Sequence, residues 1–346
     1  MAEIKLDMRK QLIIKIRKTL PIALLVGFFV CGIKVNAQQE ILTTQWAYNK
    51  LTTNAAYAGA KDVFSARLLH RQQWVGLDGR PITSVVNIHS PLLNNRIGLG
   101  ISYVNDKLGV VSTNYLALSY AYKLPFENGS TLSMGFNVGF DAFKIRSTEL
   151  EAINNTDPLL QQDLQKINFK TGVGAYYYGN KFYVGVSSPN VVPHRLINTD
   201  DVNSLNTDAG KESKQSIHLY LIAGYAFEMA DKKFVLKPQA LFKSTVGGNR
   251  KSPWQIDFNL SMILWERLIV GSTFRTTIAN KNDTDLENIA STDVMMGFYI
   301  GKKFLVSYAY DFTIGGIKNH DSGSHEILLG LDMDFKKKGA FTPRYF

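Results

Sequence analysis

The main regular feature of this chain is an alternation of apolar with polar or small residues, which recurs from about residue 62 to residue 335. Within residues 130–142, for example, Leu132, Met134, Phe136, Val138 and Phe140 alternate with serine, glycine, asparagine and aspartate. Successive side chains of a β-strand point to opposite faces, so each such segment has one apolar and one polar face. No comparably long stretch keeps a helical period. The pattern predicts an all-β protein.

About fourteen alternating segments can be counted along the sequence. An even number of antiparallel strands is typical of a closed barrel of the bacterial outer membrane. The expected strands are 62–75, 80–89, 96–104, 111–123, 130–145, 168–178, 181–187, 215–228, 233–243, 253–264, 267–278, 292–300, 303–312 and 323–335.

A soluble β-sandwich or propeller is the alternative fold. Most of the segments are longer than the roughly 5–6 residues of a typical soluble strand and match a tilted strand that crosses a membrane. Their polar faces carry glycine, serine, asparagine, aspartate and lysine, which suits a wet lumen. Aromatic residues lie near the strand ends, where membrane interfaces are expected, as at Trp254, Trp265 and Tyr308. These features favour a single transmembrane antiparallel β-barrel.

The connections between the expected strands alternate in length. Every second one is brief, such as 90–95, 179–180 and 265–266, whereas the others include the long polar stretches 146–167 and 188–214. Outer-membrane barrels have short periplasmic turns and longer extracellular loops. The alternation therefore predicts which connections face the cell exterior.

The first 37 residues resemble a secretory signal peptide. A basic stretch ends at Lys18, an apolar stretch runs to Cys31, and Ala37 ends a small-residue cleavage motif. The alternatives are an uncleaved anchor helix and a lipoprotein processed at Cys31, although Phe28-Phe29-Val30 lacks the small residue that such processing favours. We expect cleavage after Ala37. The remaining boundaries are a periplasmic segment 38–61, the barrel 62–336 and a periplasmic tail 337–346.

Charge and cysteine content narrow the possible functions. The formal net charge is +10, but the first 37 residues hold seven basic and only two acidic residues, and the other basic residues are scattered. A nucleic-acid-binding protein would concentrate its basic residues on one face. Cys31 is the only cysteine, so cleavage would leave a mature chain without disulfide or thiol chemistry. We expect no nucleic-acid partner.

Short motifs after the cleavage site resemble the PorP/SprF family, which is associated with the type IX secretion system. Asn54-Ala55-Ala56-Tyr57-Ala58-Gly59 is similar to the family's Asn-Pro-Ala-Tyr-Ala-Gly motif, with Ala55 in place of the proline. Arg71-Gln72-Gln73-Trp74-x-Gly76 and Gly79-Arg80-Pro81-x-Thr83 are similar to its next blocks, and Pro343-Arg344-Tyr345-Phe346 to its usual end. The candidate partner-contact or assembly residues are Asn54, Tyr57, Gly59, Arg71, Gln72, Gln73, Trp74, Arg344, Tyr345 and Phe346.

The resemblance implies a barrel in the outer membrane that serves export of particular surface proteins, often large adhesins, and in some members gliding motility. The expected partners are outer-membrane lipid, the type IX machinery and a secreted adhesin-like client. The resemblance implies no catalytic centre and no cofactor.

The residues themselves give little sign of an enzyme. The six histidines show no metal-ligand spacing such as HExxH. His320-Asp321-Ser322 and His325-Glu326 contain the residue types of a hydrolase, but no strained serine elbow surrounds them. Asp283-Thr284-Asp285 lacks the ligand series of a calcium loop. Gly98, Gly100, Gly135 and Gly139 are read as lumen-facing or curvature positions rather than phosphate sites.

Three functions thus compete on the sequence. The leading hypothesis is a non-enzymatic accessory barrel of type IX secretion, which aids secretion and surface localisation of a cognate adhesin. The second is a passive porin for small solutes, supported by the polar inner face alone. An outer-membrane hydrolase is the third, and it lacks a credible nucleophile and base.

Overall fold

The computed structural model describes residues 43–149, 163–192, 217–230, 233–246, 254–278, 290–301, 303–314 and 322–334. All of the described residues belong to one compact unit. The expected signal peptide, the tail 337–346 and most of the long connections lie outside the described residues.

The described part of the chain forms one antiparallel sheet that closes on itself, because β10 pairs with both β8 and β11. The strands are β1 (Phe64–Gln72), β2 (Ile82–Leu92), β3 (Ile97–Leu108), β4 (Val111–Pro125), β5 (Thr131–Ile145), β6 (Leu164–Tyr178), β7 (Phe182–Ser188), β8 (Ile217–Tyr225), β9 (Phe227–Met229), β10 (Phe234–Val246), β11 (Trp254–Leu264), β12 (Leu268–Ile278), β13 (Ala290–Ile300), β14 (Phe304–Ile314) and β15 (Ser324–Met333). Three short 3₁₀ turns complete it: η1 (Trp46–Tyr48), η2 (Ala55–Tyr57) and η3 (Ser147–Glu149).

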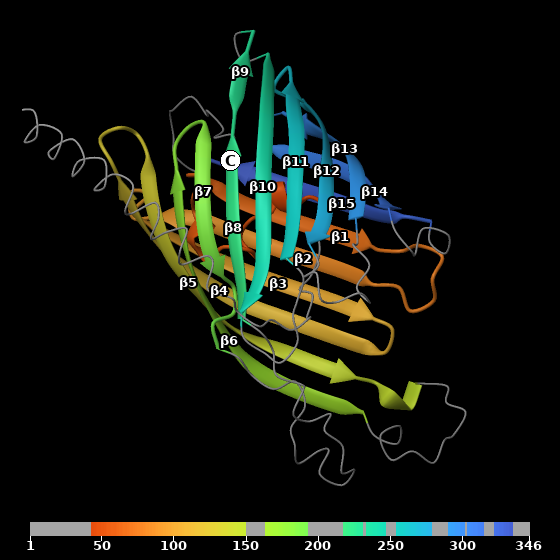
Figure 1. Cartoon of the computed structure of the whole chain (residues 1–346). Helices are drawn as coiled ribbons and strands as arrows, with labels where there is room; N and C mark the ends of the chain where they lie inside the picture. Colours follow the sequence, from red (N-terminus) through yellow and green to blue (C-terminus); the bar gives the residue numbers. More distant parts are fainter. Residues whose placement is uncertain are drawn as a thin grey trace, which may run out of the picture. The chain divides into compact units, whose positions relative to one another are not determined.

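The strands β8 and β9 are two parts of one strand, interrupted at Ala226. Both parts pair with β10, and the Ala226 N–H donates to the Lys181 carbonyl at 2.7 Å, which carries the ladder across the interruption. The described barrel therefore has fourteen strands, as the sequence predicted. In Figure 1 the wall containing β7–β11 crosses in front of the wall containing β1–β4 at a steep angle, as strongly tilted strands on opposite walls do.

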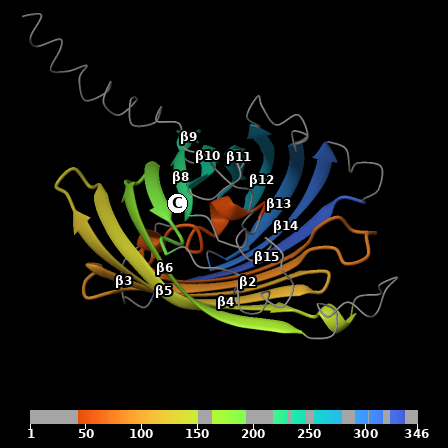
Figure 2. The same cartoon turned by 60° about the horizontal axis from the view of Figure 1, so that its bottom comes forward.

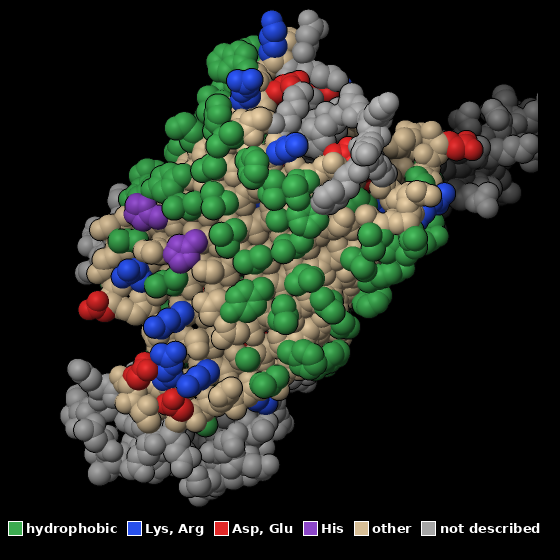
Figure 3. All heavy atoms as spheres, turned by 180° about the vertical axis from the view of Figure 1, so that it is seen from behind, with side chains coloured by type: hydrophobic (Ala, Val, Ile, Leu, Met, Phe, Trp, Pro, Cys, Tyr) green, Lys and Arg blue, Asp and Glu red, His purple; other side chains and the backbone are tan. Residues whose placement is uncertain are grey.

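The two faces of each strand differ as the alternation predicted. On β4 and β5, the apolar side chains Leu116, Leu118, Phe136, Val138 and Phe140 point outward and are exposed, whereas Asn137 and Asp141 are buried inside. Figure 3 shows hydrophobic side chains spread over the outer wall, with charged side chains mostly toward its ends. This arrangement is that of a barrel in the outer membrane, which presents its apolar face to lipid.

The six short connections are confirmed, and they lie at one end of the barrel, here called the short-turn end. The opposite end is the long-connection end. One connection there is also short, because β3 and β4 are joined by residues 109–110 alone. The prediction ended the third strand at residue 104, but Asn105–Leu108 continue the ladder against Val111–Asn114. Polar residues on both strands obscured this extension in the sequence.

The segment before β1 occupies the inside of the barrel. Residues 43–61 include Trp46, Leu51, Ala56 and Tyr57, all of which are buried, and Figure 2 shows this segment within the curve of the strands. The expectation of a periplasmic segment over 38–61 is therefore corrected for its described part. A barrel of about eight strands can be filled by its own side chains, but a wider one needs water or another segment in its lumen.

Candidate functional site

Residues 43–61, here called the plug, cross the lumen from one end to the other. At the start of the plug, Thr44 contacts Arg71 and Glu326, which lie near the long-connection ends of β1 and β15. At its finish, Gly59 lies against Gly98 at the short-turn end of β3. The plug therefore enters the described lumen near the long connections and leaves it next to the first residue of β1.

The first turn of the plug is held by Glu326. This carboxylate is fully buried and accepts hydrogen bonds from the backbone N–H groups of Thr44, at 2.8 Å, and Gln45, at 2.7 Å. Arg71 lies beside it, with Nη1 3.4 Å from Oε2 of Glu326, and its Nη1 also donates to the Thr44 hydroxyl. Hydrogen bonds to an ionised carboxylate are stronger than neutral ones, so these contacts fix the start of the plug.

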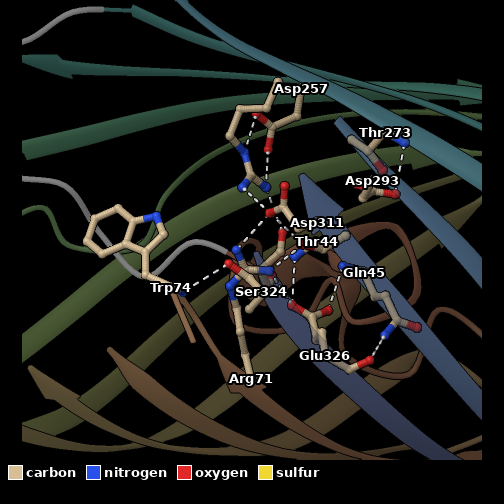
Figure 4. Close-up of polar contacts among 12 residues, drawn as sticks. Thr44, Gln45, Arg71, Trp74, Asp257, Thr273, Asp293, Asp311, Ser324 and Glu326 are labelled. Atoms are coloured by element: carbon tan, nitrogen blue, oxygen red, sulfur yellow. Dashed lines mark hydrogen bonds and ion pairs between the residues drawn. The ribbon is translucent and has the colours of Figure 1, made fainter. Parts of the chain in front are cut away.

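A second arginine extends this group of charges. Arg275 binds Asp257 through two nitrogens, at 3.0 and 3.2 Å, and its Nη2 donates to the Thr43 carbonyl at 3.1 Å. Asp311 links the two halves, because it lies 2.8 Å from Arg71 and 3.8 Å from Arg275. Figure 4 shows Arg71, Asp257, Asp311 and Glu326 converging on the start of the plug. They come from β1, β11, β14 and β15, and Arg275 comes from β12. The charged cluster is defined as Arg71, Arg275, Asp257, Asp311 and Glu326.

The second half of the plug lies on glycines of the inner wall. A Cβ atom on Gly98 would lie 1.9 Å from the Ala58 carbonyl oxygen, and one on Gly135 would lie 2.7 Å from Ala56 Cα. A Cβ on Gly174 would lie 2.2 Å from Asn54 Oδ1. A larger residue at Gly98 or Gly135 would displace the plug backbone, and one at Gly174 would displace the Asn54 side chain. The glycine patch is defined as Gly98, Gly135, Gly174 and Gly185.

Asn54 begins this second half and joins plug to wall. Its Oδ1 accepts a hydrogen bond from the Ala56 N–H at 2.9 Å, which caps η2, while its Nδ2 donates to the Ala175 carbonyl at 3.1 Å. Ser133 Oγ donates to the Ala56 carbonyl at 2.6 Å. The plug thus satisfies its backbone groups partly with the wall, as buried polar groups require.

An aromatic group fills the middle of the lumen. Tyr57 packs edge-on against His89, with ring centres 5.3 Å apart, and against Tyr176, at 5.5 Å. The ammonium of Lys50 lies 4.8 Å from the ring centre of Tyr183 and donates to the Ala47 carbonyl. The ring faces of Tyr57 and Tyr183 stabilise a positive charge at this buried position. This packing leaves the plug embedded rather than resting on one wall.

Ionic contacts at the short-turn end fix the junction between the plug and β1. Asp332 accepts from Arg67 at 2.8 Å, from Lys61 at 3.1 Å and from the Ser65 hydroxyl at 2.7 Å. On the other side of the lumen, Lys123 Nζ donates to the Gly59 carbonyl at 2.8 Å. The plug is therefore held at its start, along its length and at its finish.

The described residues contain no group of three His, Cys, Asp or Glu side chains that could hold a metal ion. Nor does the described part of the chain include a helix long and apolar enough to span a membrane.

A family model for the type IX secretion system membrane protein PorP/SprF matches residues 35–331. The chain belongs to the PorP/SprF family. No curated protein sequence matches this PorP/SprF chain.

Several solved barrels are similar to this PorP/SprF protein. A Pseudomonas aeruginosa FadL homologue is 9% identical, with a TM-score of 0.45, 80% of this chain covered and 92% of that one. The Acinetobacter baumannii outer membrane protein Omp33 is 8% identical, with a TM-score of 0.44 and coverages of 80% and 100%. The KdgM porin is 8% identical, with a TM-score of 0.36 and coverages of 78% and 99%. Similarity at these sequence identities and TM-scores carries no information about function.

The motifs that resemble the PorP/SprF family meet at the plug. Asn54, Tyr57 and Gly59 lie in it, and Arg71 belongs to the charged cluster that holds it. The structure thus places these four residues in the barrel lumen. There they contact other residues of the same chain.

The remaining predicted site residues lie elsewhere. Gln72 ends β1 with an outward side chain 3.4 Å from the His70 ring, and Gln73 donates its N–H to the Pro81 carbonyl at 2.9 Å. Trp74 has a positive φ and donates its N–H to the Ser324 hydroxyl at 3.2 Å. Arg344, Tyr345 and Phe346 lie outside the described residues. For all ten predicted residues a partner-contact or assembly role remains a prediction.

Sequence reasoning missed the carboxylates that hold the plug. In the sequence, Asp257, Asp311 and Glu326 belong to the alternating segments 253–264, 303–312 and 323–335, and no motif marks them as a site. The available signal is that these carboxylates, like Arg71 and Arg275, occupy the alternating strand positions that face the lumen. A concentration of both signs of charge on one stretch of inner wall indicates pairing rather than a simple water-filled channel.

Proposed function

We propose that this PorP/SprF barrel is a non-enzymatic accessory component of type IX secretion that aids the secretion and surface localisation of a cognate adhesin-like protein. Membership of the family connects the chain to type IX secretion. The plug is the observation that supports an accessory role rather than a porin. A segment seated on glycines and held by buried ion pairs obstructs solute flow through the lumen. The barrel is therefore better suited to binding or guiding a client than to passive diffusion.

Specificity would come from contacts that one client chain satisfies and others do not. The sequence holds no nucleotide-binding motif, so the work of translocation would come from other parts of the machinery. The expected contact regions are the long connections, the part of the lumen beyond the plug, and the tail 337–346. Involvement in gliding motility would follow if the client is a motility adhesin.

Deletion of the gene tests this proposal. The expected result is that one or a few surface proteins disappear from the cell surface, measured by mass spectrometry after brief protease treatment of intact cells, while general type IX cargo is retained. The control is complementation with the unaltered gene. Normal surface proteins combined with slower uptake of small solutes would contradict the proposal and favour the porin hypothesis.

A further inference from the structure

One stretch of the barrel wall has a neighbouring strand on one side only. β6 pairs with β5 along its whole length, from Leu164 to Tyr178, but with β7 only from Val173 to Tyr178. Among the described residues, no strand pairs with residues 164–172 on the side away from β5. Figure 1 shows this first half of β6 extending beyond the end of β7. The sheet therefore has a local edge at the long-connection end.

A proline accounts for the early end of β7. Pro189 directly follows this strand and has no backbone N–H to donate to a ladder. The chain then makes one more bond to β6, from the Val191 N–H to the Thr171 carbonyl at 2.8 Å. Gly172 permits this approach, because a Cβ there would lie 2.4 Å from the Pro189 carbonyl oxygen. The side of residues 164–170 that faces away from β5 is here called the open edge.

The hydrogen-bonding groups of the open edge belong to alternate residues. In an antiparallel ladder a residue directs its N–H and its C=O to the same neighbouring strand, and successive residues alternate between the two neighbours. Thr171 directs its carbonyl away from β5, so Ile167 and Phe169 direct their N–H and C=O groups to that side as well. In the described part of the chain, these groups have no backbone partner there.

The same residues present apolar side chains to the outside. Ile167 is 65% exposed and Phe169 51%, and the Phe169 ring lies 5.8 Å from that of Phe140 on β5. Polar side chains begin at the next outward position, Gln165, which pairs with Lys144. The open edge thus runs from the polar rim into the apolar outer wall. Open sheet edges are not found exposed to lipid, because unpaired backbone groups there have no water to bind.

Another strand of polypeptide is the partner that fits such an edge. It offers N–H and C=O groups at the spacing of a β-ladder, and the addition of a strand to a free edge is a common mode of peptide recognition. Side chains of the added strand would alternate between the outer wall, beside Phe169, and the interior, beside Asn168 and Lys170. We therefore expect it to be apolar on one face and polar on the other.

We infer that the open edge receives one extended strand of the secreted client, held by backbone hydrogen bonds with Ile167 and Phe169. This inference rests on the proposed function, because the strand would belong to the client. The chain's own connection, residues 193–216, is the alternative occupant, but its sequence has no run in which apolar and polar residues alternate. Recognition is thereby located in the wall of the barrel rather than only on the long connections.

A proline at position 167 tests the inference. Ile167→Pro removes one N–H from the open edge but none from the ladder with β5, since the Ile167 N–H points away from β5. It should cause loss of surface display of the client that the deletion strain identifies. Ile167→Ala shortens the same side chain but keeps the N–H, so it should leave display unchanged. Barrel amount and heat-modifiability are measured for both variants, so that a folding defect is recognised.

Cross-linking on intact cells supplies a second measurement that does not depend on the proline variant. A photoreactive phenylalanine replaces Phe169 at the open edge or Leu118, which is exposed on the outside of β4, two strands away. We expect mass spectrometry to find a peptide of the client joined to position 169 and not to position 118.

Three results would overturn the inference. They are normal display in a folded Ile167→Pro barrel, an equal loss of display in Ile167→Ala, and a position 169 that is joined only to lipid, only to this chain or to nothing. Client display that survives gene deletion would instead refute the proposed function itself.

Discussion

At the short-turn end of the lumen, Asn54–Ala58 of the plug lie directly on the glycine patch, whereas at the other end Thr43–Gln45 are held by charged side chains. The first contact is one of shape, since a missing Cβ lets two backbones approach. The second is one of hydrogen bonds and ion pairs, centred on Glu326 and Arg275. The two ends of one short segment therefore rely on different physical interactions.

This difference predicts how the plug can respond to a partner. Neither water nor another peptide can easily replace the close packing of the plug backbone against glycines. The Asn54–Ala58 end should therefore stay in place while the barrel is folded. Backbone N–H groups and carboxylates can exchange partners with another peptide or with water at a modest net change in free energy. The Thr43–Gln45 end is thus the part that a client could displace.

The largest expected effect comes from Gly98→Val. Its new side chain would overlap the Ala58 carbonyl, which lies 1.9 Å from an ideal Cβ position, and backbone cannot move aside as a flexible side chain can. We expect the Asn54–Ala58 end to leave its site, so that a cysteine in place of Ala56 reacts with a soluble maleimide in purified barrels.

The control is Leu99→Val, the adjacent residue, whose side chain points outward. It should leave the cysteine at position 56 protected. Protection of that cysteine in a folded Gly98→Val barrel would show that the glycine patch does not determine the position of the plug.

A smaller effect is expected from Glu326→Ala. It removes the acceptor for two backbone N–H groups and leaves Arg71 with one fewer carboxylate, and breaking a buried ion pair costs on the order of 3–5 kcal/mol. We expect a cysteine in place of Thr43 to react on intact cells, while a cysteine in place of Ala56 stays protected.

Glu326→Gln serves as the milder comparison, because an amide oxygen can still accept one of the N–H groups. Equal exposure of positions 43 and 56 in Glu326→Ala would mean that the plug leaves as one unit. In that case the two ends are not independent.

The smallest effect is expected from Asn54→Ala. The variant loses the hydrogen bond that caps η2, the one to the Ala175 carbonyl and the side-chain contacts with Gly174 and Gly185, but it keeps the backbone contacts with Gly98 and Gly135. Loss of a side-chain cap typically costs about 0.5–2 kcal/mol. We expect a lower temperature for loss of the folded band on gels, with position 56 still protected below that temperature. Full exposure of position 56 would show that Asn54, rather than the glycines, holds this end.

The barrel could be predicted from the sequence because apolar and polar residues alternate within each strand, so that each strand is recognisable from its own residues. All fourteen expected strands are present, and errors fall at ends such as Asn105–Leu108, where polar residues face one another across two strands. The inward position of Gly98 and Gly135 was also predicted correctly. Alternation is a local signal, so it is readable without knowledge of the closed structure.

The plug could not be predicted in the same way. Residues 43–61 show neither helical nor strand period, and a segment of this kind reads as a linker. Its position is determined by contacts across the whole chain, such as Thr44 with Glu326, which no local pattern records. The sequence predicts Gly98 and Gly135, which lie opposite Ala58 and Ala56, only as lumen-facing or curvature positions, and no local pattern indicates that another segment packs on them.

The account depends most on the claim that residues 43–61 close the lumen, and conductance in planar lipid bilayers measures that directly. Purified full-length barrel should show no steady conductance of the size expected for a fourteen-stranded lumen. A variant lacking residues 43–58, with its heat-modifiability confirmed, should show stable open channels. Steady large conductance in the unaltered protein, equal to that of the variant, would contradict the claim and make this barrel a porin.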